Sequence, residues 1–234
     1  MTSLRRRTRS PRGSGELLAD EIIDSATALL LEKEDAEAVS VRAVASRVGV
    51  TPPSIYLHFA DKEALLDAVC ARYFEQLDVK ITEAAAGITD PLRRALSQGM
   101  AYVRFAVATP VLYRNAFHRI TPDSSTMVEE VLAASAFVQF SATVAELAEA
   151  GLFAESEVGD VVLEFWAAAH GIASLMIAKP RLGWGDDFQR AESMLRSVCL
   201  GRAVIGVVSS GQTSKDKARA VQGLITELGT PDRN

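Results

Sequence analysis

The chain has 234 residues, of which 48% are hydrophobic and 24% charged, with a formal net charge of −5, which is typical of a soluble globular protein with one or two domains. Its two cysteines, Cys70 and Cys199, lie far apart, and its basic start lacks the apolar stretch of a secretory signal, so we expect a cytoplasmic protein without disulfides. No apolar run reaches the roughly 18 residues of a membrane span, because Glu164 and His170 interrupt residues 161–178; we expect a buried helix there and no membrane partner.

Residues 1–14 are predicted to form a flexible basic arm. The first 62 residues hold nine basic and nine acidic side chains, so the net negative charge belongs to the rest of the chain. Arginines that neutralise phosphates release counterions, and this local charge therefore suits nucleic acid better than the total suggests. The arm could enter a minor groove or could be a solvated tail that adds nonspecific attraction only. Its candidate DNA contacts are Arg5, Arg6 and Arg7.

An apolar stripe at Leu18, Ile22 and Leu29 predicts a first helix. A second helix should begin after Ser40, a good N-cap, and end at Gly49. Between these two residues, apolar side chains recur at a spacing of three and four. This short helix and the turn that follows resemble the first half of a helix-turn-helix.

Pro52 and Pro53 mark the start of a third helix, because the first helical positions need no amide hydrogen; which proline is the first helical residue stays open. Ile55 and Phe59, spaced i and i+4, should turn inward. The outward face would carry Ser54, Leu57 and His58, with Tyr56 beside it. This arrangement predicts a helix-turn-helix whose exposed face meets DNA.

Asp61 is predicted to cap a further helix, which would bring its N-terminal amides beside Lys62. Such a pair suits a phosphate oxygen. The helix should run into the eighties and link the two domains. The alternative is a three-helix module that mediates another interaction and does not bind DNA.

About ten positions resemble, in register, the TetR family of bacterial transcription regulators, over roughly residues 16–77. The matching residues are Val44, Ala45, Gly49, Val50, Thr51, Ile55, Tyr56, His58, Phe59, Lys62 and Leu65. The resemblance implies base contacts from Thr51, Pro52, Pro53, Ser54 and Leu57, and phosphate contacts from Tyr56, His58 and Lys62, with Arg42 as a further phosphate candidate. Leu57 departs from the polar or aromatic residue often found at its position, which argues against hydrogen-bonded readout there.

The rest of the chain is predicted to be helical near residues 90–108, 111–117, 124–150, 156–178 and 187–208, with boundaries at prolines and glycines. No alternating strand pattern occurs in the sequence, so the expected fold class is all-α. The expected divisions are the arm (1–14), the helix-turn-helix domain (15–62), a helical regulatory and dimerisation domain (63–210) and a tail (211–234) that is frayed or forms a short helix.

The regulatory domain contains bulky apolar side chains with a few polar groups, which is the composition of a small-molecule pocket. Our candidates for contact with a small, largely apolar effector are Tyr102, Phe105, Phe117, Phe137, Trp166 and His170. Each aromatic could equally be plain core. Residues 165–175 also resemble the Trp, His-Gly segment of one TetR subgroup.

A homodimer is expected from the mechanism, since one short recognition helix reads few bases and two copies read a palindrome. The last two long helices are apolar broadly enough to bury one face inward and one against a twin, although both could instead be central in a monomer. The residues that make up these inward and outward faces together are Val161, Phe165, Ala168, Ala169, Ile172 and Leu175, and Leu195, Val198, Cys199, Arg202, Ala203 and Ile205.

The sequence lacks a Gly-rich phosphate loop, an HExxH, a CxxC and a nucleophile elbow, so we expect no enzyme, no cofactor and no metal. The prediction is a ligand-responsive repressor that binds a palindromic double-stranded operator as a homodimer. An activator, a redox-sensing regulator that uses Cys70 or Cys199, and, least of all, an enzyme that uses His170 are the alternatives.

Overall fold

The computed structural model describes residues 14–118, 135–185 and 188–208, together with residues 213, 215, 216, 218, 219, 222 and 223. Within these residues every regular element is helical, which confirms the all-α fold class. The basic arm with Arg5, Arg6 and Arg7, the first part of the helix expected over 124–150, and most of the tail lie outside the described residues.

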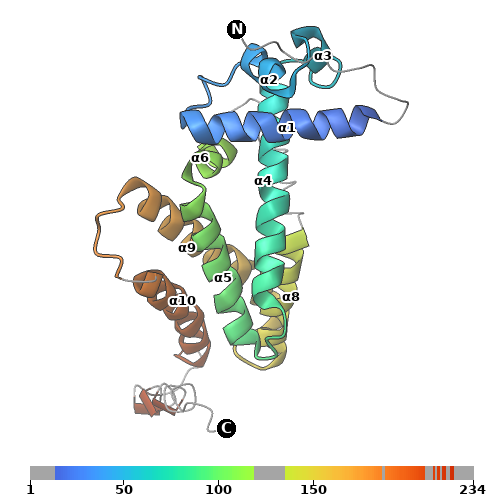
Figure 1. Ribbon diagram of the computed structural model, residues 1–234. Coiled ribbons are helices and arrows are strands. Elements are labelled where there is room, and N and C mark those ends of the chain that lie inside the picture. The colour runs from blue at the N-terminus through green and yellow to red at the C-terminus, as the bar shows by residue number, and fades with distance from the viewer. Residues whose placement is uncertain are drawn as a thin grey trace. The chain divides into compact units, whose positions relative to one another are not determined.

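The chain divides into two compact units, which we describe separately. The N-terminal unit is Met1–Leu77 with Ala108–Val131, and the C-terminal unit is Asp78–Val107 with Leu132–Asn234. The division falls inside the long helix α4 (Lys62–Ala85), which therefore contributes to both units (Figure 1). The functional division expected at residue 62 remains a proposal.

The N-terminal unit contains α1 (Ser14–Lys33), α2 (Val41–Val48), α3 (Pro52–Tyr56), α6 (Pro110–His118) and the first part of α4. Figure 1 shows α1 lying across α4, at the end that carries α2 and α3. Its core contains fully buried apolar residues from each of the first four helices: Ile22, Leu30, Val44, Ile55 and Leu65. The stripe expected on the first helix is therefore its buried face.

The helix-turn-helix has the predicted local signals. The Ser40 side chain accepts a hydrogen bond from the Ala43 amide at 3.2 Å, and Gly49 ends α2 with a left-handed φ of 79°. Thr51 is the N-cap residue of α3, which settles Pro52 as its first helical residue. Asp61 accepts a hydrogen bond from the Ala64 amide at 2.8 Å and so caps α4.

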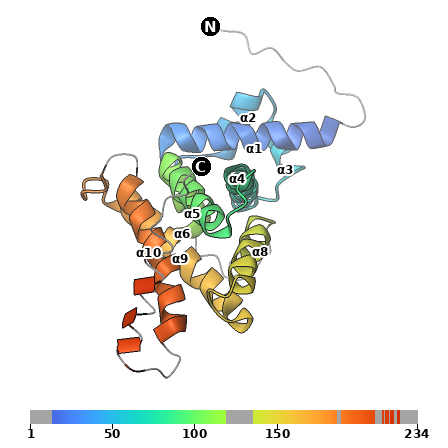
Figure 2. The ribbon, with the colours of Figure 1, turned by 90° about the horizontal axis from the view of Figure 1, so that it is seen from below.

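The C-terminal unit contains the end of α4, α5 (Pro91–Ala108), α8 (Ser135–Glu149), the 3-10 helix η1 (Glu155–Glu157), α9 (Val158–Ala178) and α10 (Gln189–Val208). Helix α9 contacts both α8 and α10, and Figure 2 shows it running between them. The helix expected over 156–178 thus begins with a 3-10 turn, where the Glu157 carboxylate accepts a hydrogen bond from the Ala154 amide at 2.9 Å.

A glycine sets the distance between two helices of this unit. A Cβ built on Gly99 of α5 would lie only 2.6 Å from Cε1 of Phe165 in α9 and 3.1 Å from Cδ1 of Leu195 in α10. Phe165 also stacks on Phe140 of α8, with ring centroids 4.9 Å apart. Gly99 therefore lets α5 approach an aromatic layer that joins three helices.

One helical segment in the described part of the chain, Glu155–Ala178, is long and apolar enough by composition to cross a membrane, with a hydropathy of 1.7. Core helices of soluble proteins pass the same test. Only 33% of its most apolar window is buried within the chain, so the helix is less covered than the expected buried helix. Its exposed apolar residues include Leu163, Ala167 and Leu175.

Candidate functional site

Residues 51–58, which we call the reading segment, present two large side chains to solvent. Leu57 is 85% exposed and Tyr56 is 53% exposed. Ile55 of α3 points into the core and is only 1% exposed. Pro53 is exposed as well, and His58 is half-buried. Phe59, whose amide donates to the Ile55 carbonyl at 3.0 Å in the expected i and i+4 relation, is only half-buried.

The two hydroxyl groups expected to read bases contact one another. The Oγ atoms of Thr51 and Ser54 lie 3.1 Å apart in a hydrogen bond, and Thr51 makes no side-chain cap to the helix. One hydroxyl therefore donates to the other. The other hydroxyl keeps its O–H, and both oxygens can still accept hydrogen bonds from DNA.

The cations that flank the segment are partly neutralised. Lys62 donates to the Glu37 carboxylate at 3.4 Å, and this glutamate is 90% exposed. Arg47 pairs with Glu32 at 2.8 Å, whereas Arg42 is simply exposed at the start of α2. The sequence analysis missed Glu37, and no local pattern identifies it, because 25 residues separate it from Lys62.

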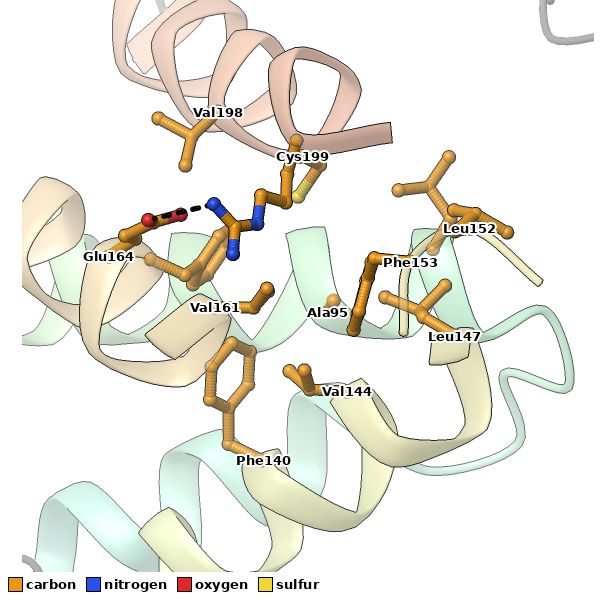
Figure 3. A pocket seen from close by; sticks show the side chains of 13 residues that line it. Ala95, Phe140, Val144, Leu147, Leu152, Phe153, Val161, Glu164, Val198 and Cys199 are labelled. Atoms are coloured by element: carbon orange, nitrogen blue, oxygen red, sulfur yellow. Dashed lines mark hydrogen bonds and ion pairs between the residues drawn. The ribbon is translucent and has the colours of Figure 1, made fainter. Parts of the chain in front are cut away.

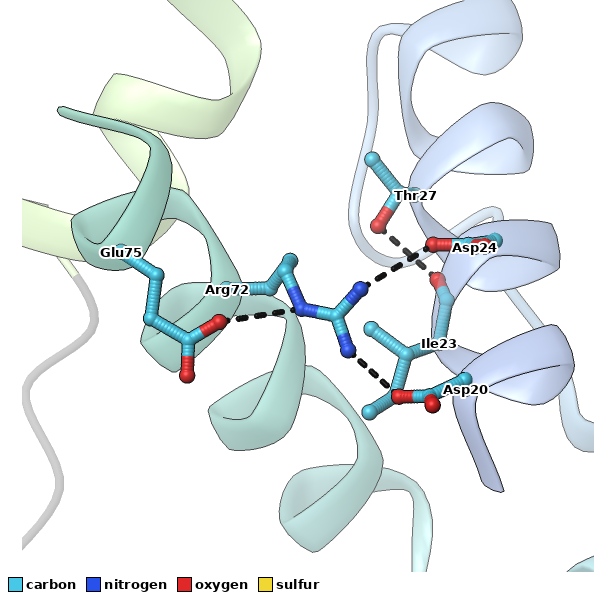
Figure 4. Close-up of polar contacts among 6 residues, drawn as sticks. All are labelled: Asp20, Ile23, Asp24, Thr27, Arg72 and Glu75. Carbon is cyan, nitrogen blue, oxygen red and sulfur yellow. Dashed lines mark hydrogen bonds and ion pairs between the residues drawn. The ribbon is translucent and has the colours of Figure 1, made fainter. Parts of the chain in front are cut away.

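A charged cluster joins α1 to α4 (Figure 4). The Arg72 guanidinium lies 2.6 Å from Asp20, 3.5 Å from Asp24 and 3.1 Å from Glu75. The hydrogen bond to Asp20 contributes most to raising the pKa of Arg72, and the charges of the three carboxylates add to it. Arg72 thereby fixes α4 to the helix that supports the reader.

The structure brings three of the six candidate effector residues together in the C-terminal unit. The Tyr102 hydroxyl and His170 Nδ1 lie 3.0 Å apart, and the Trp166 and His170 rings have centroids 5.7 Å apart. Phe105 and Phe137 are half-buried elsewhere in this unit.

Phe117 belongs instead to the N-terminal unit. Its ring packs edge-to-face on Phe74 with centroids 5.4 Å apart and lies 4.9 Å from the ring of Tyr113. These contacts make Phe117 part of an aromatic cluster in that unit.

A small apolar cavity in the C-terminal unit lies among α5, α8, α9 and α10 (Figure 3). Its volume is about 20 Å³, which is enough for one water molecule and far below the several hundred Å³ of a typical ligand pocket. Arg202 is one of its lining residues and lies 2.8 Å from Glu157 and 3.3 Å from Glu164. The lining residues are Leu92, Ala95, Phe140, Val144, Leu147, Leu152, Phe153, Val161, Glu164, Phe165, Val198, Cys199 and Arg202.

None of the six candidate effector residues lines this cavity. Sequence periodicity identifies the apolar face of each helix but not which faces meet. The sequence therefore could not show that Phe140 and Phe165, among all the aromatic residues, line the cavity. An open groove of about 420 Å³ lies between α9 and α10, and it too is lined by other residues.

Neither cysteine has the surroundings of a reactive thiol. Cys70 is 2% exposed and accepts a hydrogen bond from the Asn115 amide at 3.0 Å. Burial raises the pKa of Cys199 to about 12, which keeps the thiol protonated at neutral pH. The described residues contain no group of three or more His, Cys, Asp or Glu side chains that could hold a metal ion.

Comparison with known proteins matches two family models. Residues 22–69 match the model described as bacterial regulatory proteins, tetR family, and residues 95–198 match the tetracyclin repressor-like C-terminal domain. An uncharacterized HTH-type transcriptional regulator of Bacillus subtilis (strain 168), YobS, is 25% identical over 186 residues, which cover 77% of this chain and 87% of that protein.

Solved structures share the fold at low sequence identity. A protein of unknown function from Rhodococcus sp. RHA1 has a TM-score of 0.67 and 22% identity, and covers 85% of this chain and 97% of its own. The fatty acid degradation regulator FadR of Bacillus halodurans has a TM-score of 0.60 and 16% identity, with coverages of 83% and 99%. A TetR variant from Acinetobacter baumannii AYE in complex with minocycline has a TM-score of 0.56 and 16% identity, with coverages of 85% and 99%.

The two matched models fall on different parts of the chain. The first covers the capped helices of the reading segment, and the second covers the helical unit with the cavity and the groove. No comparison assigns the chain to the Trp, His-Gly subgroup. The chain belongs to the TetR family and is a DNA-binding transcription regulator with an N-terminal helix-turn-helix.

Proposed function

We propose that this protein is a cytoplasmic, ligand-responsive repressor that binds a palindromic operator as a homodimer. The observation that carries the proposal is the exposed reading segment, in which Tyr56 and Leu57 project from a capped helix-turn-helix that the core holds through Ile55. A short helix of this kind reads few bases, so discrimination requires two copies on one site.

The apolar outer face of the last two long helices supports the homodimer. On α9, Leu163, Ala167, Gly171 and Leu175 follow at intervals of four and so share one face. Leu163 is 55% and Leu175 is 49% exposed, and on α10 Ile205 is 54% exposed. Small residues in the middle of this stripe would let a second copy approach closely, and the groove between α9 and α10 would accept its side chains.

A direct test of the dimer is sedimentation of variants with a charge in the stripe. Leu175→Glu should produce monomers at concentrations at which the wild-type chain is dimeric, because two carboxylates would be buried in the interface. Val138→Glu, at a position of α8 that is 59% exposed, is the matched control and should remain dimeric. Equal association of both variants would exclude this interface.

The proposed effector enters the C-terminal unit at the cavity among α5, α8, α9 and α10. The present volume of about 20 Å³ is too small, so binding must separate Phe140 from Phe165 or move Arg202 from its two glutamates. Because α4 contributes to both units, a change in the C-terminal unit can alter the distance between the two helix-turn-helix segments of the proposed dimer. The effector shifts this equilibrium only by its difference in affinity between the two states.

The test of ligand response is operator binding in the presence of a panel of small apolar compounds. An active compound should lower operator affinity, and Phe140→Trp, which fills the cavity, should weaken that response without loss of DNA binding. Ligand control would be contradicted if no compound changed operator affinity and if none changed the hydrogen exchange of the backbone amides around the cavity. Repression is tested with a reporter gene placed under control of the operator. Its expression should rise when the gene that encodes this protein is deleted.

The DNA contacts are tested by salt dependence. Lys62→Ala should weaken binding to all sequences about equally and flatten the dependence of affinity on salt, because a phosphate contact is lost. Changes at Thr51 or Ser54 should instead alter the preferred bases. If both kinds of variant had the same effect, the proposed division into phosphate and base contacts would be wrong.

A further inference from the structure

The reading segment combines two observations that the general DNA-binding role does not explain. It exposes a large apolar side chain, since Leu57 is 85% exposed, the highest value among the described large hydrophobic side chains. Its hydroxyl groups, on Thr51 and Ser54, are hydrogen-bonded to each other at 3.1 Å. One of the two O–H donors is therefore used within the segment, and the largest exposed fraction among its large hydrophobic side chains belongs to Leu57.

Leu57 has no structural reason to be apolar. It follows the last residue of α3, its backbone amide bonds to the Ile55 carbonyl, and its side chain contributes little to the core. Pro53 on the same segment is also exposed. An apolar side chain in this position gains from burial only when the protein is bound to its partner.

The major groove offers one apolar group among the base edges, the C5-methyl group of thymine. The other edges there present hydrogen-bond donors and acceptors, which a leucine side chain would leave unpaired. Leucine over guanine, adenine or cytosine would thus cost desolvation, whereas leucine over thymine would bury two apolar groups together.

We propose that Leu57 reads a thymine methyl group in each operator half-site, so that van der Waals contact and not hydrogen bonding sets the base preference at that position. The inference rests on the DNA-binding role of the helix-turn-helix and adds to it the chemical group that is recognised. Arg42 and Lys62 would hold the segment against the backbone without selecting sequence.

The experiment begins with the selection of binding sites from random duplex DNA by the full-length protein. In the best site, each thymine is then replaced singly by deoxyuridine, which removes the methyl group and keeps every hydrogen bond. One thymine per half-site should lose about fourfold in affinity on replacement, which corresponds to about 0.8 kcal/mol per buried methyl-sized group. All measurements are made at one salt concentration, because affinity depends on it.

Protein variants separate Leu57 from its neighbours. Leu57→Ala should bind the thymine and deoxyuridine sites with nearly equal affinity, whereas Leu57→Met, which keeps an apolar side chain, should retain the difference. Val138→Ala, at a position of α8 that is 59% exposed and belongs to the other unit, is the control and should retain the difference as well. Because Leu57 is almost fully exposed, its replacement should leave the circular dichroism spectrum and unfolding midpoint unchanged.

The outcomes are distinguishable. Insensitivity of the selected site to deoxyuridine at every thymine, or sensitivity that persists in Leu57→Ala, would overturn the inference while leaving DNA binding intact. If replacement of cytosine by 5-methylcytosine at the same position restored affinity in a site lacking thymine, the methyl group itself would be confirmed as the recognised feature. Failure to select any sequence would instead contradict the DNA-binding role.

Discussion

Replacement of Gly99 by alanine should destabilise the C-terminal unit, although alanine is the better helix former. At an unobstructed helical position this exchange would stabilise by about 1 kcal/mol. Here the new methyl group would lie 2.6 Å from Cε1 and 2.7 Å from Cζ of Phe165, and 3.1 Å from Cδ1 of Leu195. Such distances are too short for carbon atoms, so the ring of Phe165 must move.

The cost of that movement follows from the surroundings of the ring. Phe165 is 4% exposed, Leu195 is fully buried, and the Phe165 ring stacks on Phe140, so no neighbour can yield without disturbing a third residue. Overpacking typically costs about 1–3 kcal/mol, and we take the upper part of this range, about 2–3 kcal/mol, because each of these neighbours is itself tightly packed. After the gain in helix propensity, the net loss should be about 1–2 kcal/mol.

The assay is urea unfolding followed by circular dichroism, at one protein concentration because the stability of a dimer depends on it. Gly159→Ala is the matched control, since this exposed glycine of α9 has no neighbour within 4 Å of an added Cβ, and it should be as stable as wild type or slightly more so. A Gly99→Ala chain that also carries Phe165→Leu should lose less than the sum of the two single changes. If Gly99→Ala were as stable as Gly159→Ala, the described packing of α5 on α9 would be wrong.

Three further predictions concern charge and titration. Arg72→Gln should lower the unfolding free energy by about 1 kcal/mol at low salt, because it removes ion pairs that join α4 to α1, and the difference should shrink in high salt when unfolding is compared at the two ionic strengths. Glu37→Gln should tighten binding to all DNA sequences severalfold in mobility-shift titrations, because it frees Lys62 for phosphate, and this gain should vanish in a Lys62→Ala background. The pKa of Cys199 is about 12 in the folded chain against an ordinary value of 9.0, so the unfolded state loses its proton first and stability should fall as pH rises from about 9 to 12; a Cys199→Ala chain should show a shallower decline, and an equal decline would refute the assignment.

The helix-turn-helix could be predicted closely because its signals are local. Ser40, Gly49, Pro52 and Asp61 each act on residues within one helical turn, and each occupies the cap or helix start that its chemistry favours. The exposure of Leu57 follows from the same helical periodicity, since Ile55 fixes the inward face.

The regulatory unit was less predictable because its chemistry depends on which helix faces meet. The periodicity of α9 shows that Phe165 lies on an apolar face, but the contact with Phe140 requires the register between two helices that are separate in sequence. The same holds for the pair of Tyr102 and His170, which lie 68 residues apart. The pairing of Glu37 with Lys62 could not be predicted, because an exposed side chain in a loop belongs to no periodic pattern that would indicate its partner.

Footprinting of the purified full-length protein on its own genomic DNA in low salt is the most direct test of paired reading by the two helix-turn-helix segments. The account predicts a protected region with dyad symmetry, whose half-sites have centres about one helical turn, or a multiple of it, apart. Leu175→Glu, which is designed to separate the protomers, should abolish this protection. Failure of the wild-type protein to protect any fragment, or equal protection by the dissociated variant, would contradict the account.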